Sequence, residues 1–152
     1  MKNLLTMILA GWLAACQTQS TPTNATENIT LTKEMIGTFN QHAWKDMASF
    51  YRDTASFLDP SFGSEYVRQT RVQTQEKYAA MEKMFPDIRD DIVMLHASGE
   101  NVILEFVSSG TSADGSKFKV PICSILTFDH GKIVKDATYY TLCTDNLSVA
   151  GK

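Results

Sequence analysis

The chain has 152 residues, of which 43% are hydrophobic and 20% are charged, and its formal net charge is −3. This length suits one compact domain, and the hydrophobic fraction suffices to build a core. The slight acidity and the lack of a basic block in the sequence argue against nucleic acid as a partner.

The N-terminus predicts an exported protein. Lys2 precedes an apolar run over residues 4–13, which is too short to span a bilayer and ends in small residues, as a secretory signal does. The run leads into Leu-Ala-Ala-Cys at residues 13–16, which resembles the lipobox of bacterial lipoproteins. This resemblance implies that a signal peptide of residues 1–15 is removed and that Cys16 is diacylated with palmitate-type chains. The alternative is an ordinary signal peptide with a chance cysteine.

The lipid would hold the protein on a membrane surface without threading it through the bilayer. Because Gln17 is not an aspartate, the resemblance implies the outer membrane, with the domain facing the periplasm. The following residues are rich in Thr, Gln, Ser and Asn, which is typical of a flexible tether. We therefore expect a lipidated tether over residues 16–29, one domain over 30–145 and a C-terminal tail over 146–152.

Two helical segments are expected in the first half of this domain. Thr30 or Thr32 can cap the first segment, in which apolar residues recur every three or four positions. Gly37 and Asn40 weaken its middle, so two abutting helices are an alternative. The apolar stripe consists of Ile36, Phe39, Ala43, Met47, Phe50 and Tyr51.

The second helical segment is expected over residues 64–85, and Pro86 ends it. Between the two segments, the short apolar stretch 57–62 contains Asp59-Pro60 and predicts a strand edge that runs into a turn. The expected buried stripe of the second helix consists of Val67, Val72, Tyr78, Met81 and Phe85.

Four strands are expected after the second helix, over residues 92–97, 102–112, 117–128 and 132–143. They are separated by the turn signals Gly99-Glu100, Asp114-Gly115 and His130-Gly131. Helices packed on one face of a strongly curved antiparallel sheet form an α+β fold. The short connections favour a meander.

Two-residue turns would set the register of these strands, because side chains alternate strictly between the two faces of a sheet. The expected pairs are Leu95 with Leu104, Phe106 with Cys123, and Ile125 with Asp136. The opposite face mixes apolar and charged groups, as a dimer interface or a partly solvated face would. The face expected beneath the helices carries Val93, Leu95, Leu104, Phe106, Cys123, Ile125, Val134, Asp136, Thr138 and Tyr140.

Cys123 and Cys143 remain unassigned in a compartment where disulfides form. The expected register places Cys123 opposite Thr138, roughly 16 Å of strand away from Cys143. A disulfide needs Cα atoms within about 7 Å of each other. We therefore expect two free thiols, with Cys123 buried.

Several short blocks resemble, in their order and spacing, the SnoaL-like branch of the nuclear transport factor 2-like superfamily. The resemblance covers about Thr32 to Tyr140. It implies a cone-shaped, cystatin-like α+β barrel with a pocket between helices and sheet, and a homodimer formed through the outer sheet face. The blocks are Phe-Asn-Gln-His-Ala-Trp at 39–44, Phe-Leu-Asp-Pro at 57–60, Phe-Pro-Asp at 85–87, Asp-Gly at 114–115, and Gly-Lys-Ile at 131–133 ahead of Tyr139-Tyr140.

Ketosteroid isomerase is a relative in this superfamily, and the comparison argues against its activity here. Asp59-Pro60 resembles the context of its base. Its oxyanion hole, however, needs an aspartate shortly after a proline on a late strand, where this chain has Cys123. It also needs a tyrosine on the first helix, and residues 31–50 contain none. Each missing donor would cost on the order of a hundredfold in rate.

Two carboxylates are the candidate catalytic residues. Asp59 is either a pocket base or a turn residue that caps nearby amides. Asp136 is either a desolvated pocket carboxyl with a raised pKa or, if the register is off by one, a solvated group. In the catalytic alternative Asp59 acts as the base, with Asp136 or Tyr140 as the acid. The expected pocket wall consists of Trp44, Tyr78, Met81, Leu104, Phe106, Cys123, Ile125 and Thr138.

The sequence contains no metal-ligand spacing, nucleophile elbow or glycine-rich phosphate loop, so we expect neither a metal nor a cofactor. The superfamily holds isomerases, cyclases, dehydratases, hydrolases and binding modules, so the fold alone does not decide the chemistry. One function is therefore cofactor-free acid/base catalysis on a small, mostly apolar molecule. The alternative is a non-catalytic ligand-binding or dimeric interaction module.

Overall fold

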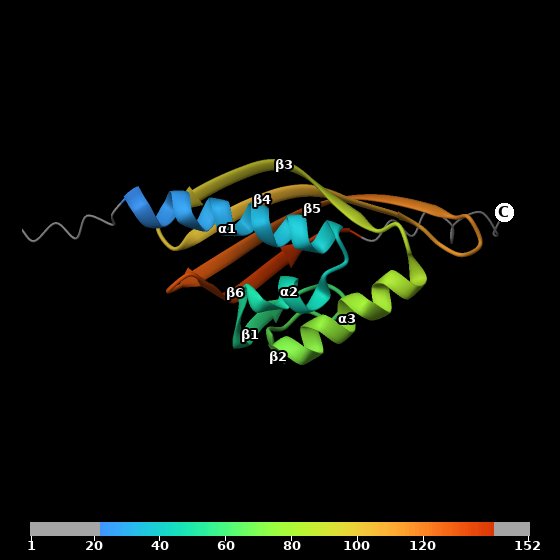
Figure 1. The fold of residues 1–152 in the computed structure, drawn as a ribbon, viewed down its shortest axis with the longest axis horizontal. Coiled ribbons are helices and arrows are strands. Elements are labelled where there is room, and N and C mark those ends of the chain that lie inside the picture. The colour runs from blue at the N-terminus through green and yellow to red at the C-terminus, as the bar shows by residue number, and fades with distance from the viewer. Residues whose placement is uncertain (1–21, 142–152) are drawn as a thin grey trace, which may run out of the picture.

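The computed structural model describes residues 22–141. Within them, helices pack on a curved mixed sheet that does not close into a barrel, and this α+β architecture agrees with the expected fold class (Figure 1). The helices are α1 (Pro22–Asn40), α2 (Trp44–Ser49) and α3 (Arg71–Met84). The strands are β1 (Tyr51–Leu58), β2 (Val67–Thr70), β3 (Arg89–Ser98), β4 (Asn101–Thr111), β5 (Lys117–Asp129) and β6 (Lys132–Tyr139).

The strand order is β2-β1-β6-β5-β4-β3, and β3 to β6 form the expected antiparallel meander. β1 departs from the expectation of a purely antiparallel sheet, because it pairs parallel to β6 and antiparallel to β2. A parallel pair needs a long connection, which α3 and the meander supply. The first and last long strands therefore lie side by side, and Asp59 at the end of β1 comes close to residues that follow β6.

α1 begins at Pro22 rather than at Thr30 or Thr32, so it includes residues 22–29, which we had assigned to the tether. Both threonine hydroxyls donate to the backbone carbonyl four residues earlier, as residues inside a helix do. α1 packs across β3 and β4 (Figure 1). No helix within residues 22–141 is long and apolar enough to cross a bilayer.

The alternative of two abutting helices is confirmed, and the break lies at residues 41–43. His42 has a φ of +56°, a left-handed conformation that the interior of a helix does not accommodate. Its Nε2 donates to the carbonyl oxygen of Ile88 at 2.8 Å, which ties the break to the start of β3. α2 then ends at Ser49, and Tyr51 begins β1 instead of continuing a helix.

α3 is shorter than the helix expected over residues 64–85, because Val67–Thr70 form the edge strand β2. A capping box starts α3: the Thr70 hydroxyl accepts from the backbone N–H of Gln73, and the Gln73 side chain accepts from the N–H of Thr70. Val72, expected to be buried, is 61% exposed. The rest of the expected stripe packs on the core, namely Val67, Tyr78, Met81 and Phe85.

The first hairpin has the expected register, and the second does not. Leu95 lies opposite Leu104, since Gly99 takes a φ of +58° in a two-residue turn. The connection from β4 to β5, however, is the loop 112–116, so Phe106 lies opposite Ile122 rather than Cys123. One residue of slip turns every side chain of β5 to the other face of the sheet.

A β-bulge between Thr127 and Phe128 shifts the register a second time, between β5 and β6. Ile125 therefore lies opposite Ala137, and Asp136 lies opposite Leu126. This second shift reverses the first. The side chains of β6 therefore lie on the faces expected from the sequence, whereas those of β5 lie on the opposite faces.

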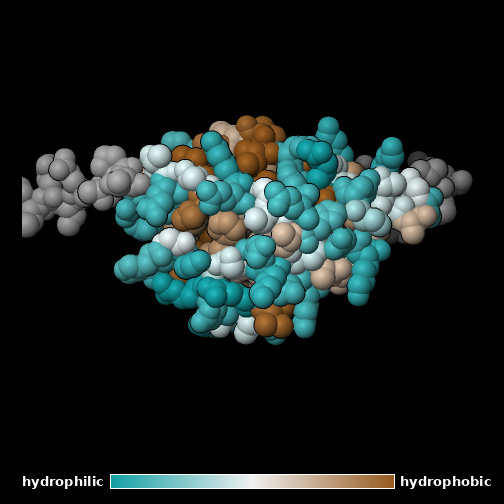
Figure 2. Space-filling model, viewed as in Figure 1, coloured by the Kyte–Doolittle hydropathy of each residue, from teal (hydrophilic) through white to brown (hydrophobic). Residues whose placement is uncertain are grey.

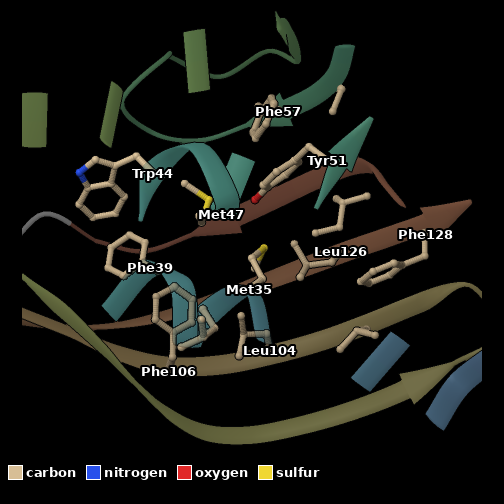
Figure 3. Close-up of a cluster of buried hydrophobic side chains, with 14 of the residues drawn as sticks. Met35, Phe39, Trp44, Met47, Tyr51, Phe57, Leu104, Phe106, Leu126 and Phe128 are labelled. Carbon is tan, nitrogen blue, oxygen red and sulfur yellow. The ribbon is translucent and has the colours of Figure 1, made fainter. Parts of the chain in front are cut away.

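The core lies between α1, α2 and the inner face of the sheet. In Figure 3, Met35 and Phe39 of α1 face Leu104 and Phe106 of β4, while Met47 of α2 points into the same cluster. Alternate residues of β4 and β5 supply the sheet side, as a half-buried strand requires. The most deeply buried large apolar side chains are Met47, Ile88, Val102, Leu104, Leu126, Phe128 and Ile133.

Candidate functional site

A cavity of about 590 Å³ lies between the helices and the inner face of the sheet. This volume falls in the range of pockets that bind small organic molecules. Its wall is mainly apolar, with aromatic and methionine side chains from α1, α2 and α3. Of the residues expected at the pocket, the structure places Tyr78, Met81, Leu104, Phe106 and Thr138 in this wall, together with Asp59, Asp136 and Tyr140.

Three residues expected in the wall lie elsewhere. Trp44 is buried beside His42, and its Nε1 donates to Oε2 of Glu82 at 2.6 Å. Cys123 is half-buried and Ile125 is 36% exposed, because the inverted register of β5 turns them away from the helices. Cys123 is therefore not the buried thiol that we expected. Cys143 lies outside the described residues.

Asp136 is a buried carboxyl on the cavity wall, only 7% exposed. The Tyr51 hydroxyl donates to its Oδ2 at 2.7 Å, and the Thr138 hydroxyl donates to its Oδ1 at 2.8 Å. The Ser124 hydroxyl lies 2.6 Å from the Thr138 hydroxyl and extends this chain to β5. Burial raises the pKa of Asp136 above the ordinary 3.8, although the hydrogen bonds from Tyr51 and Thr138 oppose the shift. Asp136 is thus a desolvated carboxyl suited to proton transfer.

Asp59, at the end of β1, has more polar surroundings. Lys77 Nζ donates to its Oδ2 at 2.6 Å, and the Ser61 N–H and the Tyr140 hydroxyl donate to its Oδ1 at 2.8 and 3.1 Å. Burial raises the pKa of Asp59, but the hydrogen bond and charge of Lys77, with the bonds from Ser61, outweigh burial and hold this pKa below the ordinary value. The bond from Ser61 is the turn cap that we weighed as the alternative role. Asp59 therefore stays ionised and is a weak base.

Besides Tyr51, two tyrosines contribute hydroxyl groups to the cavity wall, Tyr140 and Tyr78. Burial and the neighbouring Asp59 raise the pKa of Tyr140 to about 12. Burial and the charges of Asp136, Asp59 and Asp90 raise the pKa of Tyr78 well above its ordinary value of 10. Both phenols stay protonated at neutral pH, so each has a hydroxyl proton to donate in a hydrogen bond.

Residues 32–135, most of the described chain, match the family model of the SnoaL-like domain. The chain belongs to this family. No curated protein matches the sequence. Solved structures with low sequence identity match this SnoaL-like domain in fold.

One such structure is a putative SnoaL-like polyketide cyclase from Jannaschia sp. CCS1, with a TM-score of 0.69 and 14% identity over 87% of this chain and 96% of the other. Another is SalBIII, an epoxide hydrolase/cyclase-like enzyme of pyran ring formation in the polyether salinomycin, with a TM-score of 0.68 and 15% identity over 77% and 92%. A hypothetical protein with the ketosteroid isomerase-like fold from Catenulispora acidiphila, in complex with trimethylamine, has a TM-score of 0.66 and 19% identity over 74% and 85%.

The polar groups of this SnoaL-like domain's cavity that sequence reasoning missed include Tyr51, Lys77 and Asp90. The sequence around Tyr51 did not indicate a strand or a pocket residue, because Tyr51 matched the apolar stripe of the expected first helix. Lys77 lies one helical turn before Met81, so the helical period could have placed it at the cavity. Asp90 lies two residues before the strand expected to begin at Ile92, and a longer strand would have included it.

Within residues 22–141 the SnoaL-like domain has no group of three His, Cys, Asp or Glu side chains close enough to hold a metal ion. The functional groups of the cavity wall are carboxyls, hydroxyls and amines on an apolar surface. Groups of these kinds can donate hydrogen bonds to a small molecule and exchange protons with it.

Proposed function

We propose that this domain binds a small, mostly apolar molecule in its cavity and moves a proton on it without a cofactor. The reaction would be of isomerase, cyclase, dehydratase or hydrolase type. The observation that supports this most strongly is Asp136, a buried carboxyl with a raised pKa on the wall of an apolar cavity. The cyclase and the epoxide hydrolase/cyclase-like enzyme among the fold neighbours support the reaction class, and the complex with trimethylamine supports a small ligand.

In this proposal Asp136 transfers the proton. A carboxyl with a raised pKa is a stronger base when ionised than an ordinary one, and it also serves as an acid when protonated. Asp59, which the sequence suggested as the base, is the weaker base because Lys77 holds it ionised. We assign Asp59 to the orientation of the Tyr140 hydroxyl, which it binds.

A pH titration of the side-chain carboxyl carbons by NMR tests these two assignments. We expect Asp136 to titrate above 3.8 and Asp59 to titrate below it. Asp136→Asn and Asp59→Asn identify the two signals. Lys77→Met should raise the pKa of Asp59, since it removes the cation while leaving that carboxyl in place. If both groups titrate at or below 3.8, the acid/base proposal is wrong and a plain binding module is favoured.

A second proposal, from a different class, is a non-catalytic ligand-binding or dimeric interaction module. Figure 2 shows a hydrophobic cluster over β3 on an otherwise mostly hydrophilic face. Sedimentation equilibrium should then give a homodimer, and Ile125→Asp on the outer sheet face should give a monomer. A wild-type protein that is monomeric at high concentration contradicts the dimer. The exposed apolar side chains at the β3 edge and on the outer sheet face are Ile92, Val93, Met94, Ile125 and Tyr139.

We further propose that the mature protein is a lipoprotein anchored through Cys16 to the outer membrane and facing the periplasm. The support is the Leu-Ala-Ala-Cys stretch at residues 13–16 with Gln17 after it, all outside the described residues. Bacteria grown with an alkyne-labelled palmitate should label the wild-type protein and not Cys16→Ser. Membrane fractionation then separates outer from inner membrane. A labelled Cys16→Ser variant would place the lipid elsewhere.

A further inference from the structure

Asp90 is a second buried carboxyl of the cavity, and the chemistry proposed above does not use it. It lies near the start of β3, is 6% exposed and lines the cavity wall. Its backbone is held by the end of α1, because its N–H donates to Oδ1 of Asn40 at 2.7 Å and its carbonyl oxygen accepts from Nδ2 of Asn40 at 2.8 Å. This pair of hydrogen bonds fixes Asp90 at the wall.

The side chain of Asp90 lacks the partners that a buried carboxyl needs. Its Oδ1 atom has no hydrogen-bond partner, and no lysine, arginine or histidine among the described residues forms an ion pair with it. Ser108, opposite Asp90 in register on β4, is the one hydroxyl that offsets the burial of the carboxyl. An unsatisfied buried carboxyl is costly when it is ionised, and this cost falls when the carboxyl takes up a proton or when a partner from outside the chain binds it.

The aromatic side chains that line the same cavity as Asp90 suit a cation with an apolar body. Phe85 and Phe118 form an edge-to-face pair with ring centroids 4.7 Å apart, and both line the cavity. Phe39 and Tyr78 form a second such pair at 5.4 Å in the same wall. Aromatic faces attract ammonium groups, and they also pack against hydrocarbon.

We propose that Asp90 binds the ammonium group of a small amine whose apolar part lies among the aromatic side chains of the cavity. An ammonium group donates a hydrogen bond to Oδ1 and also supplies the countercharge that the chain lacks, whereas an alcohol supplies only the hydrogen bond. A carboxylic acid ligand would bring a second negative charge to an unpaired carboxyl. The inference rests on the proposed function only in that the cavity takes a small molecule.

The lysines that line the cavity do not pair with Asp90, so its carboxyl is left for the ammonium group of the ligand. Lys117 and Lys119 also line it, but both are exposed and lie by the loop that joins β4 to β5, where solvent and salt screen their charge. Lys77 is engaged by Asp59. Asp90 is therefore the carboxyl of this cavity that has neither a cation nor a full set of hydrogen bonds from the described residues.

Three probes with the same phenyl body test the proposal: phenethylamine, 2-phenylethanol and 3-phenylpropionate. Their affinities for the full chain are measured by calorimetry at pH 8. We expect the wild-type protein to bind the amine about tenfold more tightly than the alcohol, with the acid weakest. Asp90→Asn should lose this preference and keep its affinity for the alcohol. Asp53→Asn, the same charge change at a carboxylate that is 90% exposed, should behave as wild type.

Equal or tighter binding of the alcohol or the acid by the wild-type protein would overturn the inference. The same holds if Asp90→Asn keeps the preference for the amine, or if none of the three probes binds. The outcome is independent of the proposed acid/base function, because Asp136→Asn should retain the preference for the amine. If the protein transfers protons through Asp136 but shows no preference for the amine, the proposed function is supported and the inference about Asp90 is wrong.

Discussion

Replacing Asp136 with asparagine is expected to lower the rate at which the protein deprotonates 5-nitrobenzisoxazole by a hundredfold or more. This probe needs only a base in an apolar site. The base takes the proton from its ring carbon, a carbon–nitrogen triple bond forms, and the nitrogen–oxygen bond breaks to leave a coloured phenolate. Asparagine keeps the size of Asp136 and cannot accept that proton. The measurement is the initial rate of phenolate release, followed by absorbance.

The pH dependence of the same rate identifies the base. Only the ionised carboxylate accepts the proton, so the rate should rise with pH and level off above the pKa of Asp136, which lies above the ordinary 3.8. Tyr51→Phe removes the hydroxyl that donates to Oδ2 and keeps the ring. Because that hydrogen bond lowers the pKa of Asp136, its loss should move the inflection to higher pH.

Two variants act as references for this experiment. Asp91→Asn removes an exposed carboxylate that pairs with Arg89, and its rate should equal that of the wild-type protein. Asp59→Asn tests the role that the sequence suggested. A large loss of rate in Asp59→Asn together with an unchanged rate in Asp136→Asn would make Asp59 the base and overturn our assignment.

Asp90→Asn is expected to stabilise the protein at pH 8 by on the order of 4 kcal/mol more than it does at pH 4. Burial raises the pKa of Asp90 from 3.8 to about 7, with the hydrogen bond from Ser108 lowering it and the charge of Asp91 raising it. The folded protein therefore keeps a proton that the unfolded chain releases above pH 3.8. This contribution to stability is complete below that pH and is lost as the pH rises through 7. Asparagine does not titrate, so the free energy of unfolding of the variant does not fall in this way as the pH rises.

Urea unfolding at a series of pH values measures the effect as the difference between the free energies of unfolding of variant and wild type. The difference should grow between pH 4 and pH 7 and then level off. Asp53→Asn provides the reference here, since its carboxylate is 90% exposed and should give a difference that changes little with pH. A difference for Asp90→Asn that stays constant with pH would show that its carboxyl is solvated in the folded protein.

Local sequence signals predicted the elements of this fold well. Residues at steps of three and four predicted the helices, and glycine-containing turns predicted the meander of β3 to β6. The pairing of Leu95 with Leu104 followed from Gly99, whose positive φ closes a two-residue turn. These features depend on a few neighbouring residues, so a single sequence contains the information for them.

Features set by contacts between distant segments could not be predicted in the same way. The loop 112–116 inverted β5 and moved Cys123 and Ile125 away from the pocket, and the bulge after Thr127 restored the facing of β6. Asp136 is therefore buried as the sequence suggested, although the partner assigned to it was wrong. Neither a five-residue loop nor a bulge has a sequence signature strong enough to predict the strand register across two hairpins.

The same distinction between local and distant contacts applies to the candidate site. Residue type and strand alternation pointed to Asp136 and Tyr140 as chemistry-bearing groups, and the resemblance of Asp59-Pro60 to the ketosteroid isomerase base pointed to Asp59. Their protonation depends on partners far away in the chain: Lys77 of α3 holds Asp59 ionised, and Tyr51 of β1 binds Asp136. Oδ1 of Asp90 finds no hydrogen-bond partner among the described residues. The pKa of a carboxyl follows from its burial and the charges around it, and only the packing of β1, α3 and the meander against one another brings those charges together.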